Sequence, residues 1–351
     1  MHRILSLMIA AVVLAGCTKD DPVVPSVTLP AAVRGVYVVN EGGFGKSTAT
    51  LSFYVPDSGK VYADVFFAAN KRSLGDVGND IALYDGKAFI VVNNSHKIEI
   101  ISTETHLSLG TIDLAGNSPN KITIASSSKA YVSNLYKGSV TSFDPATYAV
   151  KKATIPVGQS PQGLAVASGK VFVCNSGYGY DSTISVIDVT KDSVVKTIPV
   201  LRSPTDIGVT AEGTIVVICN GLTDYTNSAN DTPGGIVFID PATLTVMKTV
   251  TLPLASYGHP GELAVSTSGY GLTVVKNGVL KFDTKSGAIF SDAFLHRTPY
   301  SLAVDDLSGR IYTGDAKDYD SNGSVVVFSA AGAPVDSFTV GIIPGSFGFK
   351  K

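Results

Sequence analysis

The residues whose types could carry chemistry lie where short hydrophobic runs end. His259 and Glu262 stand three positions apart, and His96 occupies a similar place earlier in the chain. Metal-assisted lyases and lactonases need histidines and carboxylates that converge on one site. The chain holds five histidines, one of them within its first three residues, so this set is small. A histidine and a glutamate that hydrogen-bond loop backbone are the favoured interpretation of the pair, and catalysis through them is the alternative.

A second pattern resembles a calcium loop. Residues 318–323, Asp-Tyr-Asp-Ser-Asn-Gly, place oxygen ligands at alternate positions and a glycine at the sharp turn. The glutamate expected at position twelve is absent, because Ser329 stands there. Calcium held by Asp318, Asp320 and Asn322 is therefore one expectation. An ordinary Asp- and Asn-rich turn is the other.

The largest group with binding chemistry consists of amides, acids and aromatic residues at strand ends and in the loops that follow. Its members are Asn40, Glu41, Phe44, Asn79, Asn93, Asn94, His96, Asn120, Asn134, Tyr136, Gln162, Asn175, Tyr178, Tyr180, Asp206, Asn220, Tyr225, His259, Glu262, Tyr300, Asp315 and Tyr319. Amides and tyrosines around one concavity suit a polar ligand with flat apolar parts. The alternative is that the asparagines merely close turns and the tyrosines shield strand edges.

A repeated phrase shows which elements must position these residues. A large hydrophobic residue, a small residue and another large one recur about three positions after a proline or glycine. The copies are Ile81-Ala82-Leu83, Ile122-Thr123-Ile124, Leu164-Ala165-Val166, Ile207-Gly208-Val209, Leu263-Ala264-Val265, Leu302-Ala303-Val304 and Phe347-Gly348-Phe349. The period is 39 to 45 residues, apart from one interval of 56. A β-rich repeat of this length predicts an all-β, seven-bladed β-propeller with four-stranded blades over residues 33–351.

The phrase is expected to be the innermost strand of each blade, with its small middle residue facing a narrow central channel. A second strand that tends to end in asparagine, a third that runs into an acidic turn and a short outer strand would complete the blade. The sequence from residue 33 starts with a second strand, whereas residues 343–349 form an inner strand with nothing after it. The C-terminal strand should therefore pair within the first blade and close the ring.

Several of these motifs carry a family resemblance. The strand endings near Asn134 and Asn175, the turn at Asp188 and the link from Thr197 to Pro204 resemble the YVTN-repeat seven-bladed propellers. Residues 37–45 and 86–95 resemble surface propeller lipoproteins of Bacteroidetes-type bacteria. Some of those capture cobalamin beside an outer-membrane transporter, so the resemblance implies a corrinoid as a candidate ligand and a transporter as a candidate partner.

The first 32 residues read as a targeting segment. A short basic start and an apolar stretch from Ile4 to Leu14 precede Leu14-Ala15-Gly16-Cys17, which matches a lipobox. The prediction is a lipoprotein signal peptide over residues 1–16, lipidation of Cys17 and a tether over residues 17–32. Lys19, Asp20 and Asp21 resemble an export signal for the outer face of the outer membrane. We expect an outer-membrane protein, anchored by lipid alone and facing the cell exterior.

Composition narrows the function classes. A net charge of −2 and a pI near 6.2 do not indicate the basic surface that binds nucleic acid. The chain has no tryptophan, whereas quinone-type dehydrogenase propellers and tryptophan-aspartate repeats depend on that residue. Cys174 and Cys219 lie at equivalent positions of neighbouring repeats, which are usually too far apart for a disulfide, so we expect buried free thiols, with a disulfide as the alternative.

These observations favour a monomeric, non-enzymatic cell-surface protein that binds a small ligand or a transporter partner on one face of the propeller. No cofactor is required by this interpretation, although calcium or a corrinoid is allowed by it. An interaction or adhesion module and a metal-assisted lyase or lactonase using His259 and Glu262 are the alternatives.

Overall fold

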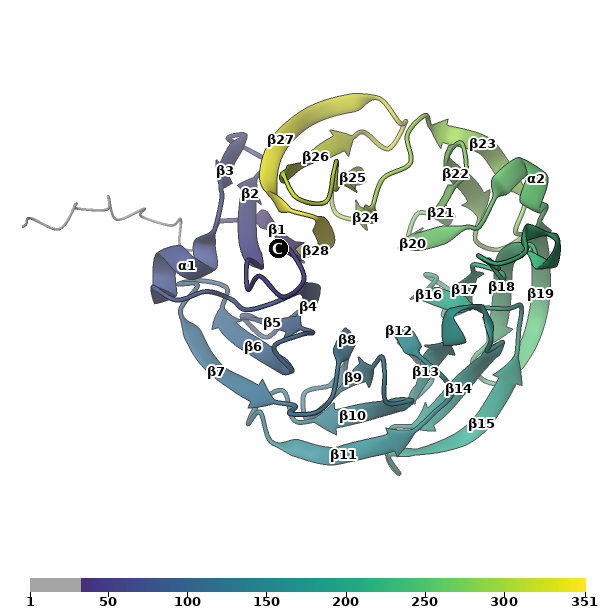
Figure 1. The fold of residues 1–351 in the computed structure, drawn as a ribbon, viewed down its shortest axis with the longest axis horizontal. Helices are drawn as coiled ribbons and strands as arrows, with labels where there is room; N and C mark the ends of the chain where they lie inside the picture. Colours follow the sequence, from purple (N-terminus) through teal and green to yellow (C-terminus); the bar gives the residue numbers. More distant parts are fainter. Residues whose placement is uncertain (1–32) are drawn as a thin grey trace, which may run out of the picture.

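The computed structural model describes residues 33–351, which form seven four-stranded antiparallel sheets arranged around a central axis. Figure 1 looks along this axis and shows the sheets as the blades of a closed ring. The seven-bladed β-propeller predicted from the repeat is thus confirmed. Within residues 33–351, no helix is long and apolar enough to cross a membrane. The proposed signal peptide, Cys17 and the tether lie outside the described residues.

Each blade runs from an inner strand beside the axis to an outer strand at the rim. From inner to outer, blade 1 contains β28 (Pro344–Lys350), β1 (Gly35–Asn40), β2 (Thr50–Val55) and β3 (Lys60–Tyr62), and blade 2 contains β4 (Gly78–Tyr84), β5 (Lys87–Val92), β6 (Lys97–Ser102) and β7 (Ser108–Asp113). In the same order, blade 3 contains β8 (Pro119–Ser126), β9 (Lys129–Asn134), β10 (Ser139–Phe143) and β11 (Val150–Pro156), blade 4 contains β12 (Pro161–Ala167), β13 (Lys170–Asn175), β14 (Thr183–Asp188) and β15 (Ser193–Pro199), and blade 5 contains β16 (Pro204–Val209), β17 (Ile215–Cys219), β18 (Gly234–Asp240) and β19 (Thr245–Leu252). Blade 6 contains β20 (Gly261–Ser266), β21 (Tyr270–Val275), β22 (Gly278–Asp283) and β23 (Ile289–Leu295), and blade 7 contains β24 (Ser301–Asp305), β25 (Arg310–Asp315), β26 (Asn322–Phe328) and β27 (Pro334–Ile342).

Short helical turns occupy some of the links between strands. They are α1 (Val65–Asn70) between blades 1 and 2, the 3-10 turns η1 (Gly177–Gly179) and η2 (Ser228–Asn230), and α2 (Leu254–Tyr257) before blade 6. Asp64 caps α1, since its carboxylate accepts the backbone N–H of Phe67 at 3.0 Å. The long β17–β18 loop and α2 account for the one expanded repeat interval. Both are drawn in green in Figure 1.

The ring closes through its first blade. The C-terminal strand β28 pairs antiparallel with β1, with Tyr37 opposite Gly348 and Val38 opposite Phe347. This is the closure that the order of strands in the sequence predicted. It removes an open sheet edge and links the two ends of the described chain in one sheet.

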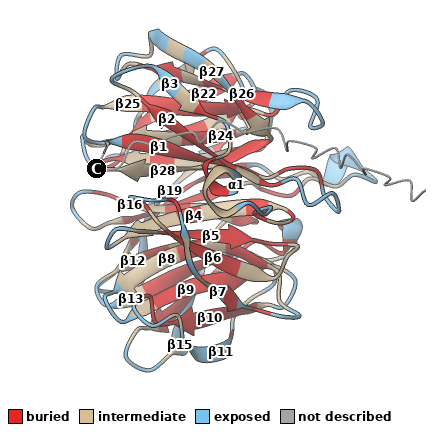
Figure 2. Ribbon diagram, turned by 90° about the vertical axis from the view of Figure 1, so that its left-hand side faces the viewer, coloured by how far each residue is buried: buried red, intermediate tan, exposed pale blue. Residues whose placement is uncertain are grey.

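The hydrophobic core is divided among the seven interfaces between neighbouring blades, each with its own cluster of buried residues. Figure 2 shows buried residues along the strands and exposed residues mainly in the loops at the two faces of the ring. Cys174 and Cys219 are buried in the cluster between blades 4 and 5, and both are free thiols, as expected from their spacing.

In at least four of the blades the small middle residue of the repeated phrase packs against a neighbouring blade and does not face the channel, which corrects the expectation from sequence; Ala303 of blade 7 does line the channel cavity. A Cβ atom placed on Gly208 would lie 2.6 Å from Cγ2 of Val265 in the next blade, and one on Gly348 would lie 3.2 Å from Cγ2 of Ile81. Ala165 and Ala264 are likewise buried in the clusters between blades. Wedge-shaped blades approach each other most closely near the axis, so a large residue on one inner strand requires a small one on its neighbour.

Candidate ligand-binding site

The polar side chains that line the channel stand immediately before the repeated phrases. We call this place the ring position, and its occupants in blades 1 to 7 are Ser346, Asp80, Lys121, Gly163, Asp206, Glu262 and Ser301. In every blade except blade 7, the inner strand contains a bulge at or beside this residue. A bulge adds one residue to a strand and re-aims its side chain, which explains how residues of a packed sheet point toward the axis.

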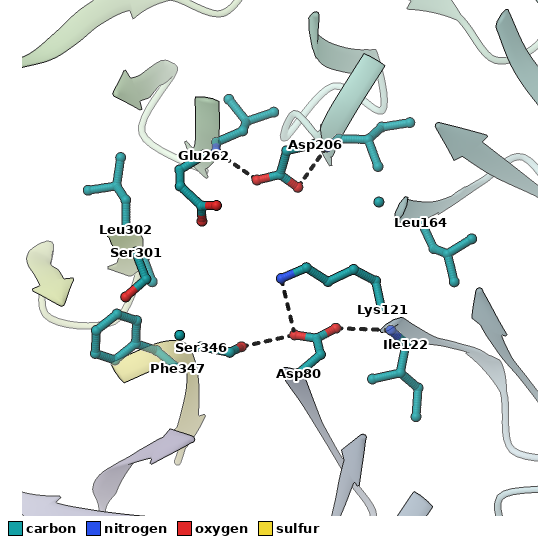
Figure 3. A pocket seen from close by; sticks show the side chains of 15 residues that line it. Asp80, Lys121, Ile122, Leu164, Asp206, Glu262, Ser301, Leu302, Ser346 and Phe347 are labelled. Atoms are coloured by element: carbon teal, nitrogen blue, oxygen red, sulfur yellow. Dashed lines mark hydrogen bonds and ion pairs between the residues drawn. The ribbon is translucent and has the colours of Figure 1, made fainter. Parts of the chain in front are cut away.

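The ring residues line a cavity of about 210 Å³ on the axis, together with the large residues that follow them in the phrase. We call it the channel cavity. Figure 3 shows Asp80, Lys121, Asp206 and Glu262 projecting into it from four different blades. Ser301 and Ser346 complete the polar lining, and Gly163 presents no side chain.

Two of the ring acids bind backbone of the following blade. Asp206 in β16 accepts the N–H of Leu263 in β20 at 2.7 Å and also that of Ile207 at 2.9 Å. Asp80 in β4 accepts the N–H of Ile122 in β8 at 2.9 Å and the hydroxyl of Ser346 at 2.9 Å. These carboxylates therefore join neighbouring inner strands, and a structural role accounts for their contacts.

Lys121 and Glu262 have no such partners. Among residues 33–351, nothing donates a hydrogen bond to the Glu262 carboxylate, and the Lys121 ammonium makes none. The nearest carboxylate oxygen to Lys121 Nζ is Oδ1 of Asp80, at 4.0 Å, the outer limit of an ion pair. Figure 3 shows the Glu262 carboxylate directed into the cavity, and the Lys121 ammonium reaching across it toward Asp80. A charged group that makes no hydrogen bond in a concave site is available to hydrogen-bond a ligand.

For both Glu262 and Lys121, burial and the opposite charges nearby shift the pKa in opposite directions. Burial raises the pKa of Glu262 to about 8, opposed by the charge of Lys121 and reinforced by Asp206, Glu41 and Asp80. Burial also raises the pKa of Asp206. For Lys121, burial lowers the pKa, but the surrounding carboxylates outweigh it and raise the pKa above its ordinary value. Lys121 is thus a permanent cation at neutral pH and is a poor nucleophile.

A second cavity, of about 340 Å³, adjoins the first where the channel opens to one face. We call it the mouth cavity. Lys121, Glu262 and Gly345 line both cavities, so these residues lie between the mouth and the channel. The hydroxyl of Tyr300 donates to Oε1 of Glu41 at 2.8 Å across the junction of blades 7 and 1. Burial raises the pKa of Glu41, and the Tyr300 hydrogen bond opposes that shift.

The structure brings part of the predicted binding set together around this mouth. The predicted residues that line it are Glu41, Phe44, Asn79, Asn93, Asn120, Tyr136, Gln162, Glu262 and Tyr300. Asp206 lines the channel cavity behind them. Phe44 and Tyr136 are the exposed aromatic members, with 78% and 68% of their surface accessible.

Several predicted asparagines serve the blades themselves. Asn40, Asn134 and Asn175 are fully buried, and each side-chain amide donates to two hydroxyl groups of the third strand in its own blade. Asn93 and Asn220 instead donate to Pro119 O and Pro260 O of the following blade, at 2.7 and 3.0 Å. The strand-ending asparagines thus mainly hold strands and blades together. This agrees with the alternative from sequence that they have a structural role, although they bond strands as well as turns.

The remaining aromatic residues lie outside both cavities. Tyr178, Tyr180 and Tyr225 are exposed and line neither the mouth nor the channel. Tyr319 packs edge-on against Tyr300, with ring centroids 5.8 Å apart. The pKa of Tyr178 is raised first by desolvation of its hydroxyl and then by the neighbouring Tyr136, which lines the mouth.

The histidines do not converge with Glu262 on a cavity. His259 contacts the carbonyl of Asn220 through Nδ1 at 3.0 Å, and its Nε2 lies 3.9 Å from Asp231. His96 contacts the carbonyl of Asn117. Both histidines therefore bind loop backbone, and neither lines the mouth or the channel. The favoured interpretation of the pair thus holds for His259 but not for Glu262, whose side chain hydrogen-bonds no backbone group of residues 33–351.

The calcium-like string folds as a surface turn. Asp318 accepts the N–H groups of Asp320 and Ser321, and Asp320 pairs with Lys46 at 2.7 Å. The carbonyl of Asn322 accepts Lys317 Nζ at 2.6 Å. Asp315, predicted for the ligand site, pairs with Arg297 at 3.2 Å. Residues 33–351 contain no group of three or more His, Cys, Asp or Glu arranged to hold a metal ion.

Four polar ring residues escaped the sequence-based prediction, namely Asp80, Lys121, Ser301 and Ser346. The sequence does contain a pattern that identifies these four residues. Each directly precedes a repeated phrase, as do Asp206 and Glu262, which were predicted. Aligning the seven phrases and reading one position upstream finds the whole ring.

A comparison with known families decides where the chain belongs. The family described as "Domain of unknown function (DUF5074)" matches residues 34–306, more than three quarters of the chain. The chain is a member of that family. No curated protein matches this DUF5074 member.

Solved structures share its fold at low sequence identity. A quinoprotein alcohol dehydrogenase-like protein from Bacteroides thetaiotaomicron is 17% identical with a TM-score of 0.65, covering 90% of the DUF5074 chain and 78% of its own. A provisionally named 6-phosphogluconolactonase from Bacteroides fragilis is 12% identical with a TM-score of 0.66, covering 91% and 99%. A functionally unknown protein from Desulfotomaculum acetoxidans is 15% identical with a TM-score of 0.66, covering 91% and 99%. At these identities the likeness is one of fold alone.

Proposed function

We propose that this protein is a non-enzymatic binding protein that takes a small polar ligand into the mouth and channel of its propeller. One observation carries the proposal. The two cavities adjoin at Lys121 and Glu262, an ammonium and a carboxyl group whose side chains make no hydrogen bond within residues 33–351; the ion pair of Lys121 with Asp80 is long, at 4.0 Å. The mouth cavity alone, at about 340 Å³, falls within the size range of small-molecule sites.

The mouth suits recognition of a ligand with both polar and apolar surface. Phe44 and Tyr136 provide flat aromatic faces, while Asn79, Asn120 and Gln162 provide amides. The Asn79 amide already donates to Asn120 Oδ1 at 2.7 Å, and the Gln162 amide donates to Ser176 at 2.8 Å. These bonds hold the amides in place before a ligand arrives, which lowers the entropy cost of binding.

The cell-surface setting forms part of the same proposal and rests on the sequence. Lipid on Cys17 would anchor the protein to the outer membrane, facing the exterior, with an outer-membrane transporter as its partner. A corrinoid is the ligand named by the resemblance to surface lipoproteins. A corrinoid is larger than the channel cavity, so it would lie over the mouth and the exposed aromatic loops.

The test is a thermal-shift and calorimetric screen of cobalamin, sugars and calcium against the full chain, followed by mutation. Phe44→Ala combined with Tyr136→Ala should weaken a bound compound about tenfold or more, because aromatic anchors supply much of the affinity at such sites. Two variants serve as controls. Tyr225→Ala changes an aromatic residue that is 96% exposed and outside the mouth, and Met247→Ala changes a separate cavity beside Asp240.

A compound whose affinity responds to Met247→Ala and ignores the Phe44 and Tyr136 changes would place the site elsewhere on the molecule. Cobalamin that produces neither a thermal shift nor heat at micromolar protein would remove the corrinoid from the proposal.

A further inference from the structure

We propose that the channel recognises a small zwitterion, whose cationic group meets Glu262 and whose anionic group meets Lys121. This inference rests on the proposed binding function and assigns its ligand class. It arises from the contrast between these two side chains, which make no hydrogen bond within residues 33–351, and the hydrogen-bonded acids around them.

The satisfied acids are already used by the fold. Asp206 accepts two backbone N–H groups, and Asp80 accepts one backbone N–H and the Ser346 hydroxyl. Glu41 accepts the Tyr300 hydroxyl. Among the carboxylates of the two cavities, Glu262 is the one that accepts no hydrogen bond from any group of residues 33–351. It is therefore the acid available to a ligand's hydrogen-bond donors.

The position of Glu262 is held by its backbone. Its φ of 41° lies in the left-handed region, where a residue with a Cβ is strained. The next residue, Leu263, donates its N–H to Asp206 of blade 5, which anchors the bulge from the neighbouring strand. The strained turn thus sets the direction of the carboxylate before binding, and Figure 3 shows it aimed into the cavity.

Lys121 supplies the complementary charge. Its ammonium has three donors and makes no hydrogen bond within residues 33–351, and the carboxylate of Asp80 lies at the limit of pairing. Because the surrounding acids keep Lys121 protonated, it can bind an anionic group, and a covalent role through a neutral amine is disfavoured.

The charged residues that line the two cavities indicate which class of ligand can bind there. A simple anion would meet Lys121 but also the field of Asp80, Asp206, Glu41 and Glu262, whereas a simple cation would meet these acids but would leave the Lys121 ammonium without a hydrogen-bond acceptor. A molecule with one group of each sign satisfies both free residues and leaves no unpaired charge, which matters most where water is partly excluded. Gly163 adds no side chain to the ring, so the cavity of about 210 Å³ keeps room for a few heavy atoms.

The experiment is calorimetric titration of the full chain with ω-amino acids, from glycine to 6-aminohexanoate. Butyrate and butylammonium serve as single-charge controls for 4-aminobutyrate. At least one amino acid of the series should bind tenfold or more tightly than either single-charge compound. Glu262→Gln and Lys121→Met should each weaken that binding tenfold or more, with thermal melting monitored to confirm folding. Butylammonium should respond to Glu262→Gln and should not lose affinity in Lys121→Met.

The pH profile provides a second readout. Zwitterion affinity should increase between pH 6 and 9 as Glu262, with its pKa near 8, loses its proton. The other titratable groups that face it are Lys121, Asp80, Asp206, Glu41 and Tyr300. Titration below pH 8 should release protons on binding, seen as heats that depend on the buffer, and Glu262→Gln should abolish that dependence.

Failure of this inference is distinguishable from failure of the proposed function. Amino acids that bind no better than butyrate and butylammonium, or an affinity that falls as the pH rises, would overturn the zwitterion assignment. If another compound from the screen still responds to the Phe44 and Tyr136 changes, the binding function stands without it. If none does, both proposals fall.

Discussion

Asp206 of blade 5 accepts a hydrogen bond of 2.7 Å from the backbone N–H of Leu263, on the inner strand of blade 6. Asp80 repeats this contact between blades 2 and 3, where it accepts the N–H of Ile122 at 2.9 Å. Each aspartate thus occupies a ring position and satisfies a donor of the next inner strand, where a bulge disrupts the regular ladder. Residues at the ring position therefore line the channel and also join neighbouring blades.

We therefore expect Asp206→Ala to reduce the free energy of unfolding by about 1–3 kcal/mol, because it leaves the N–H of Leu263 without its acceptor. Asp206→Asn keeps an acceptor oxygen and should cost less. Urea unfolding followed by circular dichroism measures both. The matched control is Asp57→Ala, an exposed aspartate in the β2–β3 turn. Equal stability of the Asp206→Ala and Asp57→Ala variants would contradict this role.

A second prediction follows from the packing between inner strands. Gly348→Leu should destabilise the protein by about 1–3 kcal/mol, because the new side chain overlaps Ile81 of blade 2. Adding Ile81→Ala should restore part of the loss, since it makes room for the leucine. Thermal melting of the two single variants and the double variant forms a cycle. Purely additive effects would show that the two positions do not pack against each other.

A third prediction concerns acid stability and His106. This residue is fully buried beside Tyr37 and Phe53, and neither of its ring nitrogens has a hydrogen-bond partner in the described part of the chain, residues 33–351. Burial, followed by the charge of Lys350, lowers the pKa of His106 to about 4. The unfolded chain binds a proton at His106 near pH 6.5, whereas the folded protein does so only near pH 4. Stability from this group is therefore complete above pH 6.5 and lost as the pH falls toward 4, by up to about 3 kcal/mol.

His106→Phe removes the titrating group and keeps an aromatic ring in the same place. Its urea midpoint should change less between pH 7 and pH 4 than that of the unaltered protein. The raised pKa values of Glu262, Glu41 and Asp206 act in the opposite direction in both proteins, because those acids gain their protons more readily in the folded state. An identical pH dependence of the two proteins would show that His106 is not the acid-sensitive group.

A fourth prediction concerns the N-terminal segment. Cys17→Ser should abolish lipid attachment, because the lipobox cysteine is the residue that carries the lipid. Cell fractionation and mass spectrometry of the mature N-terminus provide the measurement. Replacing Lys19, Asp20 and Asp21 with alanine should preserve lipidation while protecting the propeller from protease added to whole cells. Retention of Cys17→Ser in the membrane would refute the anchor, and unchanged protease access in the triple variant would refute the export signal.

The sequence by itself determined the number of blades, the identity of the inner strands and the closure of β28 onto β1. These features follow from a repeat period and from the order of strands, which are properties of consecutive residues. The burial of Cys174 and Cys219 as free thiols followed from their equivalent places in neighbouring repeats. Mouth residues such as Glu41, Phe44 and Tyr136 could also be predicted, because loops after the second strand share one face of a propeller.

Only the tertiary structure decided which polar groups meet in the channel. Asp80 and Glu262 lie far apart in the chain, and bulges in the inner strands turn them toward one axis. It also showed that Gly208 and Gly348 face the next blade, and that Asn40, Asn134 and Asn175 bond inside their own blades. A side chain's direction at a bulge and its contacts across a blade interface depend on neighbours supplied by other repeats, so periodicity within one repeat does not contain them.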